Sequence, residues 1–214
     1  MTREPHDGTK RSEILAAATR RFGRDGYEHT KWADVAADVG VGPTALYHYF
    51  ESKQHCLYVI MEEAIGDFQR RFSAITSQTP DPLEALEAVL YDCFDLTEQD
   101  ILRNRVLVSE QGLLAVHRSS SREEEARRAA RARARQLEFA WASFLAGAMR
   151  AGSVPENDAR LLSRALLGLY NSVWQWYRPD GLHGLPAVAD FFYGRTLAMI
   201  GVAPDAAKRT RMVA

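Results

Sequence analysis

The stretch Val39–Lys53, VGVGPTALYHYFESK, carries the signals that decide the fold. Pro43 suits the first turn of a helix, where its missing N–H group costs nothing, and Gly40 allows the tight turn before it. Leu46 and Phe50 lie four residues apart and can be buried on one helical face. The opposite face needs a partner, and it carries a polar and two aromatic residues: Thr44, Tyr47 and His48.

A second helix is expected immediately before this stretch. Thr30 is predicted to cap it, and its inward face carries four apolar residues: Trp32, Val35, Ala36 and Val39. Ala36 is small where two helices cross, Gly40 follows four residues later, and Leu46 comes six residues after Gly40. This is the spacing of a helix-turn-helix motif, whose second helix enters the major groove of DNA.

Helical periodicity covers almost the whole chain, and no alternating strand pattern persists, so the sequence predicts an all-α protein. Three cap signals mark helix starts at Ser52, at Asp81, and at a capping box of Ser121 with Glu124. Helices are expected over these ranges: 9–24, from 53 past 72, 82–96, 101–116, 121–152, 155–178 and 186–200.

Composition narrows the class of protein. The chain has 214 residues, 46% of them hydrophobic, and a formal net charge of -1, so bulk charge does not indicate nucleic-acid binding. Two cysteines are too few for a disulfide framework. The first ten residues, MTREPHDGTK, lack the apolar region of a signal peptide, and no apolar run is long enough to cross a membrane. A cytoplasmic protein is expected.

Neither an enzyme nor a metal site is expected. His48 and His55 belong to different predicted helices, and no acidic or thiol partners occupy ligand spacing around them. No glycine-rich phosphate loop or serine, histidine and aspartate order stands out. We therefore assign no catalytic residue, no metal ligand and no cofactor.

The stretch Thr30–Lys53, TKWADVAADVGVGPTALYHYFESK, resembles the TetR family of transcriptional regulators, most specifically in LYHYFESK. The resemblance covers about Thr9–Leu57. It implies a helix-turn-helix DNA-binding domain of three helices over 1–55, and a larger helical effector-binding and dimerisation domain over 56–214. Two positions depart from the family pattern: Trp32 stands where a smaller aliphatic residue is usual, and Gly42 where a Ser or Thr cap is usual.

The resemblance also implies roles for single residues. Thr44 and Ala45 are placed for base edges or a thymine methyl group, His48 for bases or phosphate, and Tyr47 and Lys53 for phosphates. For Tyr49, DNA contact and burial in the core are equally favoured. The predicted DNA-binding residues are Thr30, Lys31, Gly42, Pro43, Thr44, Ala45, Tyr47, His48, Tyr49 and Lys53.

An effector pocket is expected in the C-terminal part. Its predicted lining is Trp141, Phe144, Tyr170, Trp174, Tyr177 and Arg178, although aromatic residues at helical spacing also fit a plain core. The stretch NSVWQWYRPDG, residues 171–181, resembles TetR-like repressors of fatty-acid or steroid breakdown that respond to acyl-CoA thioesters. An acyl-CoA is therefore the leading hypothesis, with a small aromatic or drug-like compound as the alternative. A solvated face is the favoured interpretation of an arginine stripe formed by Arg127, Arg128, Arg131 and Arg135. The alternative is that this stripe or Arg178 holds the anionic end of the effector.

A homodimer is expected, with its interface on the helices over 155–178 and 186–201. Their apolar residues cover more surface than one internal contact needs, and they include Leu162, Leu166, Leu169, Phe191, Phe192 and Met199. The predicted function is a transcriptional repressor that binds pseudo-palindromic operator DNA. A helical protein-interaction module without DNA binding is the less favoured alternative.

Overall fold

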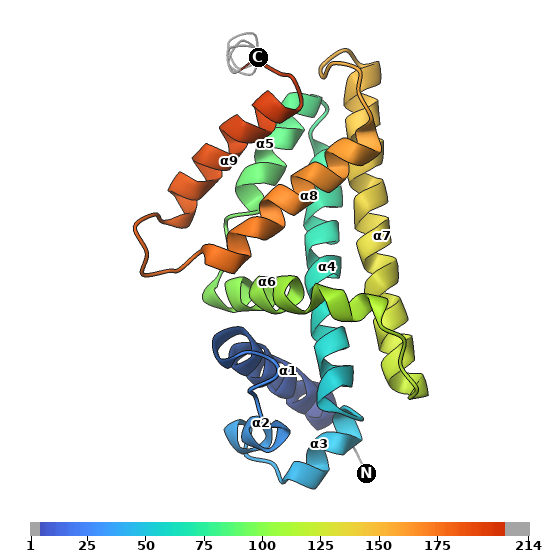
Figure 1. Ribbon diagram of the computed structural model, residues 1–214, viewed down its shortest axis with the longest axis vertical. Helices are drawn as coiled ribbons and strands as arrows, with labels where there is room; N and C mark the ends of the chain where they lie inside the picture. The colour runs from blue at the N-terminus through green and yellow to red at the C-terminus, as the bar shows by residue number, and fades with distance from the viewer. Residues whose placement is uncertain (1–4, 204–214) are drawn as a thin grey trace. The chain divides into compact units, whose positions relative to one another are not determined.

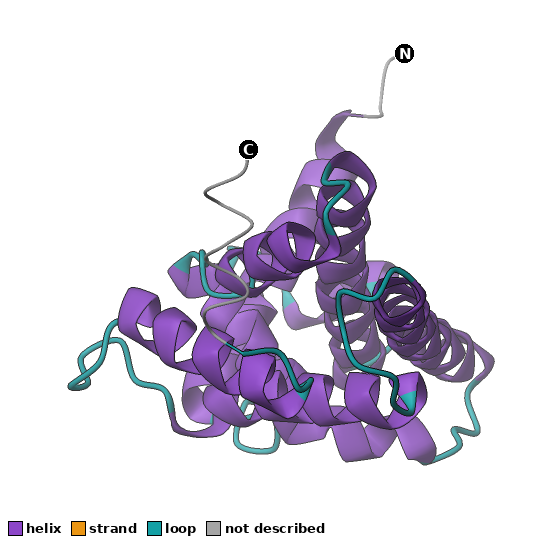
Figure 2. Cartoon of the chain, turned by 90° about the horizontal axis from the view of Figure 1, so that it is seen from above, coloured by secondary structure: helices purple, strands orange, loops and turns teal. Residues whose placement is uncertain are grey.

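The computed structural model describes residues 5–203, with side chains from residue 8 onward. This part of the chain consists of helices joined by loops and contains no strand (Figure 2), which confirms the all-α prediction. In chain order the helices are α1 (Pro5–Asp25), α2 (Trp32–Asp38), α3 (Pro43–Tyr49), α4 (Lys53–Gln78), α5 (Pro82–Asp92), α6 (Glu98–Glu110), the 3-10 helix η1 (Gln111–Ala115), α7 (Ser121–Arg150), α8 (Ala159–Trp176) and α9 (Leu185–Met199) (Figure 1).

The helices form two compact units, each built from two separate segments of the chain. The first unit contains the described residues up to Ile65 together with Thr97–Arg133. The second contains Gly66–Leu96 and the described residues from Ala134 onward. The long helices α4 and α7 therefore contribute to both. The predicted domain boundary after residue 55 does not coincide with the limits of these compact units, and it stays a prediction.

The core of the first unit joins α1, α2, α3 and the start of α4. Ile14 of α1, Val35 of α2 and Leu46 of α3 are all fully buried there. Helix α6 approaches α1 closely at Gly23, where an added Cβ atom would lie 2.8 Å from the Cβ atom of Leu102. The missing side chain of Gly23 therefore allows these two helices to pack.

Local start and stop signals are confirmed at three helix ends. Asp81 caps α5 by accepting hydrogen bonds from the backbone N–H groups of Leu83 and Glu84, both at 2.9 Å. Ser52 caps α4, since its hydroxyl oxygen accepts a bond from the N–H group of His55 at 2.9 Å. Gly40 forms the predicted tight turn after α2 in the left-handed conformation, with φ of 67°.

Helix α7 begins at Ser121 as predicted, but its predicted capping box and the predicted start of α8 are wrong. The capping box of Ser121 with Glu124 does not form, because Ser120 accepts the N–H group of Glu123 at 3.4 Å. Helix α8 begins at Ala159 rather than at residue 155, and Asp158 is its cap. In both places a polar side chain other than the expected residue accepts the free N–H groups, Ser120 for α7 and Asp158 for α8.

The second unit has an aromatic core. Helices α5 and α9 pack against one another, and the hydroxyl group of Tyr91 donates to the carboxylate of Asp190 at 2.8 Å. Phe94, just after α5, packs against Phe192 of α9, with ring centroids 5.7 Å apart. Cys93 is buried beside them, and burial raises the pKa of its thiol, so this cysteine is a packing residue.

Candidate nucleic-acid interface and ligand site

Helix α3 presents an outer face because its two anchors point inward. Leu46 and Phe50 are both fully buried. Pro43 occupies the first turn, and Gly42 is the N-cap residue with no side-chain hydrogen bond to the helix start. The missing cap predicted from Gly42 is confirmed, so apolar anchoring rather than capping holds this short helix in place.

The outer face of α3 is exposed, as predicted. Thr44 and His48 are exposed, and Tyr47 has 53% of its surface accessible, whereas Ala45 and Tyr49 are half-buried. A threonine hydroxyl, an imidazole and a phenol can all form hydrogen bonds with base edges or phosphates. The face therefore has suitable chemistry for DNA, and the contact of each residue with DNA stays a prediction.

The start of α2 differs from the prediction. Thr30 is only 4% exposed, and its hydroxyl group donates to the carbonyl oxygen of Gly26 at 2.9 Å. Lys31 is the N-cap residue instead, and no side chain caps α2. The prediction that Thr30 caps α2 is wrong, because the preceding turn already binds its hydroxyl group. Lys31 lies on the surface, whereas the side chain of Thr30 lies beneath it.

Lys53, the first residue of α4, is bonded to the loop before α2. Its ammonium group donates to the backbone carbonyl oxygens of Tyr27, at 2.8 Å, and of Thr30, at 3.0 Å. The same group lies 4.2 Å from the centre of the Tyr27 ring. An ammonium group has three hydrogens, so a phosphate oxygen could still be bound. Lys53 thus fixes the loop that enters α2, and its phosphate contact stays a prediction.

The residues directly after α3 are joined to the start of α7. The hydroxyl group of Ser52 donates to the Oε1 atom of Glu123 at 2.5 Å. The hydroxyl group of Ser120 donates to the carboxylate of Glu51. These contacts were not predicted, because partners about seventy residues apart leave no local pattern in the sequence.

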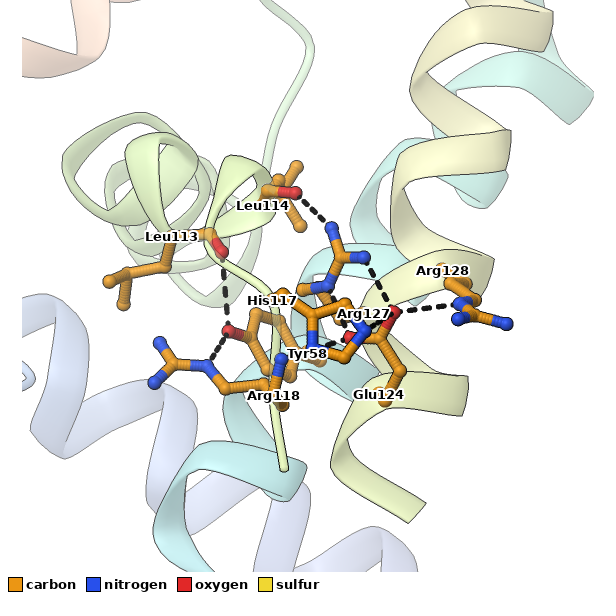
Figure 3. Close-up of polar contacts among 8 residues, drawn as sticks. All are labelled: Tyr58, Leu113, Leu114, His117, Arg118, Glu124, Arg127 and Arg128. Carbon is orange, nitrogen blue, oxygen red and sulfur yellow. Dashed lines mark hydrogen bonds and ion pairs between the residues drawn. The ribbon is translucent and has the colours of Figure 1, made fainter. Parts of the chain in front are cut away.

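A buried tyrosine extends this connection along α4 (Figure 3). Tyr58 is fully buried, and its hydroxyl group donates to the carbonyl oxygen of Leu113 at 3.2 Å. The same hydroxyl oxygen accepts a bond from the Nε atom of Arg118 at 2.8 Å. Tyr58 therefore ties η1 and the loop that follows it to α4.

Arg127 is buried rather than solvated, so the prediction for the arginine stripe is wrong at this position. Its exposed fraction is 5%, and its Nε and Nη2 atoms donate to the two carboxylate oxygens of Glu124 at 2.8 and 2.7 Å (Figure 3). Its Nη1 atom donates to the carbonyl oxygen of Leu114 at 2.5 Å. Each of the three guanidinium nitrogen atoms therefore has an acceptor, and these hydrogen bonds offset the cost of burying the charge.

The carboxylate of Glu124 is the common acceptor of this network. Besides Arg127, it accepts the backbone N–H group of Arg118 at 3.1 Å and pairs with Arg128 at 2.7 Å. Hydrogen bonds from Arg127 in particular hold the pKa of Glu124 well below its usual range. Three stripe residues are exposed as expected: Arg128, Arg131 and Arg135.

The predicted ligand site lies in the second unit. Trp141 and Phe144 of α7 both pack against Phe72 of α4, with ring centroids 4.8 and 5.8 Å apart. One turn away on α4, Phe68 stacks on Tyr170 of α8 at 5.5 Å. Helix α4 thus carries one ring of each of two contacting groups, Phe72 with α7 and Phe68 with α8. The two groups together are called the aromatic cluster.

Further along α8, Trp174 lies 5.4 Å from Tyr170 and 6.2 Å from Tyr177, ring centroid to ring centroid. Arg178 does not join them, because it is exposed and donates to the carbonyl oxygen of Tyr177. Five of the six predicted ligand residues therefore share one cluster, and Arg178 lies outside it. Whether any of them binds a ligand stays a prediction.

Two tryptophans in this cluster carry free donors. Trp141 and Trp174 are each 2% exposed, and neither Nε1 atom has a hydrogen-bond partner among the described residues. An unpaired buried donor costs about 1–3 kcal/mol. The cluster therefore offers indole N–H groups to any ligand that brings an acceptor oxygen.

Helices α8 and α9 also expose large apolar side chains, but these include only part of the set predicted for a dimer interface. Leu162 and Phe192 are buried against their own chain, at 8% and 7% exposure, so assigning them to a dimer interface was wrong. Phe191, which was also predicted at the interface, is exposed at 61%, and Leu161, which was not predicted there, is exposed at 62%. Leu166 is also buried, at 5%. Phe191 helps to line an apolar cavity of about 420 Å³ with Trp176, His183, Ala187, Val188 and Phe192.

No group of three or more histidine, cysteine or carboxylate side chains within residues 8–203 is arranged to hold a metal ion. Across the helices that the structure describes, none is long and apolar enough to cross a membrane.

Two family models match the chain. Residues 14–58 match the model described as bacterial regulatory proteins, tetR family. Residues 81–200, more than half of the chain, match the model described as tetracyclin repressor-like, C-terminal domain. The first match contains all of α2 and α3, and the second contains α5 to α9.

Individual proteins are similar over most of their length. The HTH-type transcriptional repressor KstR2 of Mycobacterium tuberculosis is 25% identical over 177 residues, which cover 81% of this chain and 84% of that protein. The TetR family regulator PfmR of Thermus thermophilus is 28% identical, with a TM-score of 0.71 over 86% of this chain and 97% of its own. AibR, solved with isovaleryl coenzyme A and operator DNA, is 22% identical with a TM-score of 0.67, over 87% and 97% of the two chains, and shows likeness of fold.

Proposed function

The chain belongs to the TetR family of bacterial transcriptional regulators, and we propose that it is a cytoplasmic repressor that binds pseudo-palindromic operator DNA as a homodimer. A small, largely apolar effector releases it from the operator. The observation that carries this proposal is the exposed face of α3 with Thr44, Tyr47 and His48, on a helix whose orientation is fixed by the buried Leu46 and Phe50. The repressor assignment is supported by the name of the similar KstR2 protein.

In this proposal α3 lies in the major groove. Thr44 and Ala45 meet base edges near the start of the helix, while Tyr47 and Lys53 meet phosphates. A two-fold dimer places two such helices on half-sites about one helical turn apart, or somewhat more. The operator should therefore be a pseudo-palindrome.

Selection from genomic DNA fragments tests the DNA-binding proposal. The purified full-length protein is incubated with fragments at moderate salt, and the bound fragments are sequenced. Recovery of a pseudo-palindromic motif supports the proposal. Recovery of no motif favours the alternative, a helical module that binds other proteins.

The proposed dimer interface lies on α8 and α9. Its support is three exposed apolar side chains, Leu161, Trp176 and Phe191, which are 62%, 50% and 61% exposed. Exposed apolar surface of this kind is typical of an association site. Small exposed residues beside it, Ala165 and Gly168 on α8, would allow close approach of a partner helix.

The proposed effector is an acyl-CoA thioester that enters the aromatic cluster around Trp141 and Trp174. The apolar acyl chain suits the packed rings, and the buried indole N–H groups suit an acceptor such as the thioester carbonyl oxygen. The NSVWQWYRPDG stretch, which contains Trp174 and Tyr177, supports the same class of effector.

Release requires an effector that prefers the DNA-incompetent state. Helix α4 is the proposed connection, because it begins directly after the DNA-reading segment, at Lys53, and carries Phe68 and Phe72 of the aromatic cluster. A ligand that displaces these rings would shift α4 and change the separation of the two reading helices in a dimer.

Thermal-shift screening tests the effector class. Acyl-CoA thioesters are compared with their free acids, with free CoA and with uncharged aromatic compounds, and each stabilising compound is then tested for operator release. Stabilisation by thioesters alone supports the proposal. Stabilisation by uncharged aromatics without any effect of thioesters supports the alternative effector class.

A further inference from the structure

A second pocket of the second unit lies between α7 and α8, and it differs in character from the aromatic cluster. Its volume is about 310 Å³. Three of its six lining residues are arginines, and the full set is Arg135, Glu138, Phe139, Ala142, Arg160 and Arg164. Three guanidinium groups against one carboxylate give the pocket an excess of positive charge.

The one carboxylate in the pocket lining is already engaged. Glu138 accepts a hydrogen bond from the Nε atom of Arg164 at 2.7 Å. Asp158 uses one carboxylate oxygen to cap α8, accepting the backbone N–H groups of Arg160 and Leu161 at 2.9 and 3.0 Å. Among the residues with described side chains, the guanidinium groups of Arg135 and Arg160 have no hydrogen bond or ion pair. Two cations therefore stay available for an anion.

The pocket also has an apolar side. Phe139 has 68% of its surface exposed, which is unusual for a phenylalanine on a helix that contributes to a core. It lines the same pocket as the arginines, together with the buried Ala142. An aromatic ring beside guanidinium groups suits a ligand that joins phosphates to a planar or apolar part.

We infer that the pocket of Arg135, Arg160 and Arg164 binds the phosphate-bearing end of the effector, a ligand end with two or more phosphate negative charges. Guanidinium groups bind phosphate oxygens through paired hydrogen bonds, and two free cations match more than one negative charge. This inference rests on the proposed acyl-CoA effector and assigns its anionic end to residues other than the exposed Arg178. It also gives Arg135 a different role from that of the buried Arg127.

Isothermal titration of the full-length protein tests the inference with CoA, 3′-dephospho-CoA, pantetheine and inorganic pyrophosphate. The double variant Arg135→Ala/Arg160→Ala should weaken CoA binding roughly tenfold or more, since charged hydrogen bonds are lost. The affinity of Arg160→Lys for CoA should lie between that of the double variant and that of the unaltered protein, because lysine keeps the charge but lacks the paired donors. Arg150→Ala, an exposed arginine of α7 outside the pocket lining, is the matched control and should bind like the unaltered protein.

The outcomes separate this inference from the proposed effector class. If CoA thioesters bind the unaltered protein and the double variant equally well, the pocket inference is overturned and the effector class stands. If no CoA species binds, the effector class fails, and pyrophosphate then decides the pocket: binding that the double variant abolishes supports it, and absence of binding overturns it. Conversion of the double variant to a monomer in light scattering would also overturn it, because the arginines would then serve a subunit contact.

Discussion

Ser52 and Glu123 are joined by a hydrogen bond of 2.5 Å, donated by the serine hydroxyl to the carboxylate. The same hydroxyl oxygen caps α4 by accepting the N–H group of His55. One side chain therefore connects the segment that follows α3 both to α4 and to the first turn of α7. The start of α7 is therefore part of the structure that holds the end of α3 in place.

Replacing Ser52 tests this connection. Ser52→Ala should lower the free energy of unfolding by about 1 kcal/mol or more, because it removes the α4 cap. Glu123→Ala should cost less, since the cap remains. Chemical denaturation of both variants and of their double variant measures the coupling between the two side chains.

The double variant supplies the control for this prediction. If Ser52 and Glu123 interact, the double variant is less destabilised than the sum of the two single variants. Strictly additive effects would show that the bond contributes nothing. Glu125→Ala, at an exposed position of the same helix turn, should leave stability unchanged.

Lys53→Ala should weaken binding to all DNA sequences alike. Lys53 supports the loop of Tyr27 and Thr30 rather than any base, so its loss carries no sequence preference. If its third hydrogen binds a phosphate, the slope of log affinity against log salt should also fall by about 0.9. Fluorescence anisotropy over a salt series measures both quantities, and a change in base preference would contradict this role.

Mild acid should destabilise the first unit through His55. Burial is the main cause that lowers the pKa of this imidazole, whose Nδ1 atom accepts the N–H group of Glu51 at 3.2 Å. Arg122 and Arg11 lower the pKa further, whereas Glu51 and Glu123 oppose the shift. As pH falls, His55 therefore binds a proton in the unfolded chain at a higher pH than in the folded chain. The free energy of unfolding falls as pH drops from about 6.5 toward the lower pKa of the folded state.

Thermal unfolding between pH 7.5 and 5 checks this sign. His55→Gln should flatten the loss of stability over that range, because glutamine does not titrate. His29→Gln alters an exposed histidine and should leave the pH dependence in place. An equal slope for the His55 variant and the unaltered protein would remove His55 as its source.

Phe191→Asp should separate the proposed dimer without unfolding the chain. Phe191 is 61% exposed, so a charge there meets water in the monomer and an apolar partner in the dimer. Phe192→Asp should instead lower the melting temperature, because Phe192 is buried against Phe94. Light scattering and thermal unfolding distinguish the two, and a Phe191→Asp protein that stays dimeric would place the interface elsewhere.

Features with local causes could be predicted from the sequence. Pro43 and the four-residue spacing of Leu46 and Phe50 indicated the start and the buried face of α3. Asp81 and Ser52 could be recognised as helix caps, because each accepts hydrogen bonds from N–H groups only two or three residues later in the chain. The aromatic residues of the candidate ligand site could be named because their size favours burial, although their common cluster depends on Phe68 and Phe72.

Features that depend on distant partners could not be predicted. Arg127 looks like any exposed arginine of a charged helix until the carbonyl oxygen of Leu114 and the carboxylate of Glu124 surround it. Thr30 resembles a cap, yet the preceding turn binds its hydroxyl group. On α8 and α9 apolar residues are adjacent in sequence, so periodicity did not decide which of Phe191 and Phe192 faces the core.

The central claim is that the exposed face of α3 reads base sequence, and affinity for single-base operator variants tests it most directly. The account predicts that Thr44→Ala changes which base is preferred at one position of each half-site, by about 1–3 kcal/mol per mismatch. Glu125→Ala, on exposed surface of α7, should keep the preferences of the unaltered protein. If Thr44→Ala and His48→Ala both bind every operator variant as the unaltered protein does, α3 does not read the sequence.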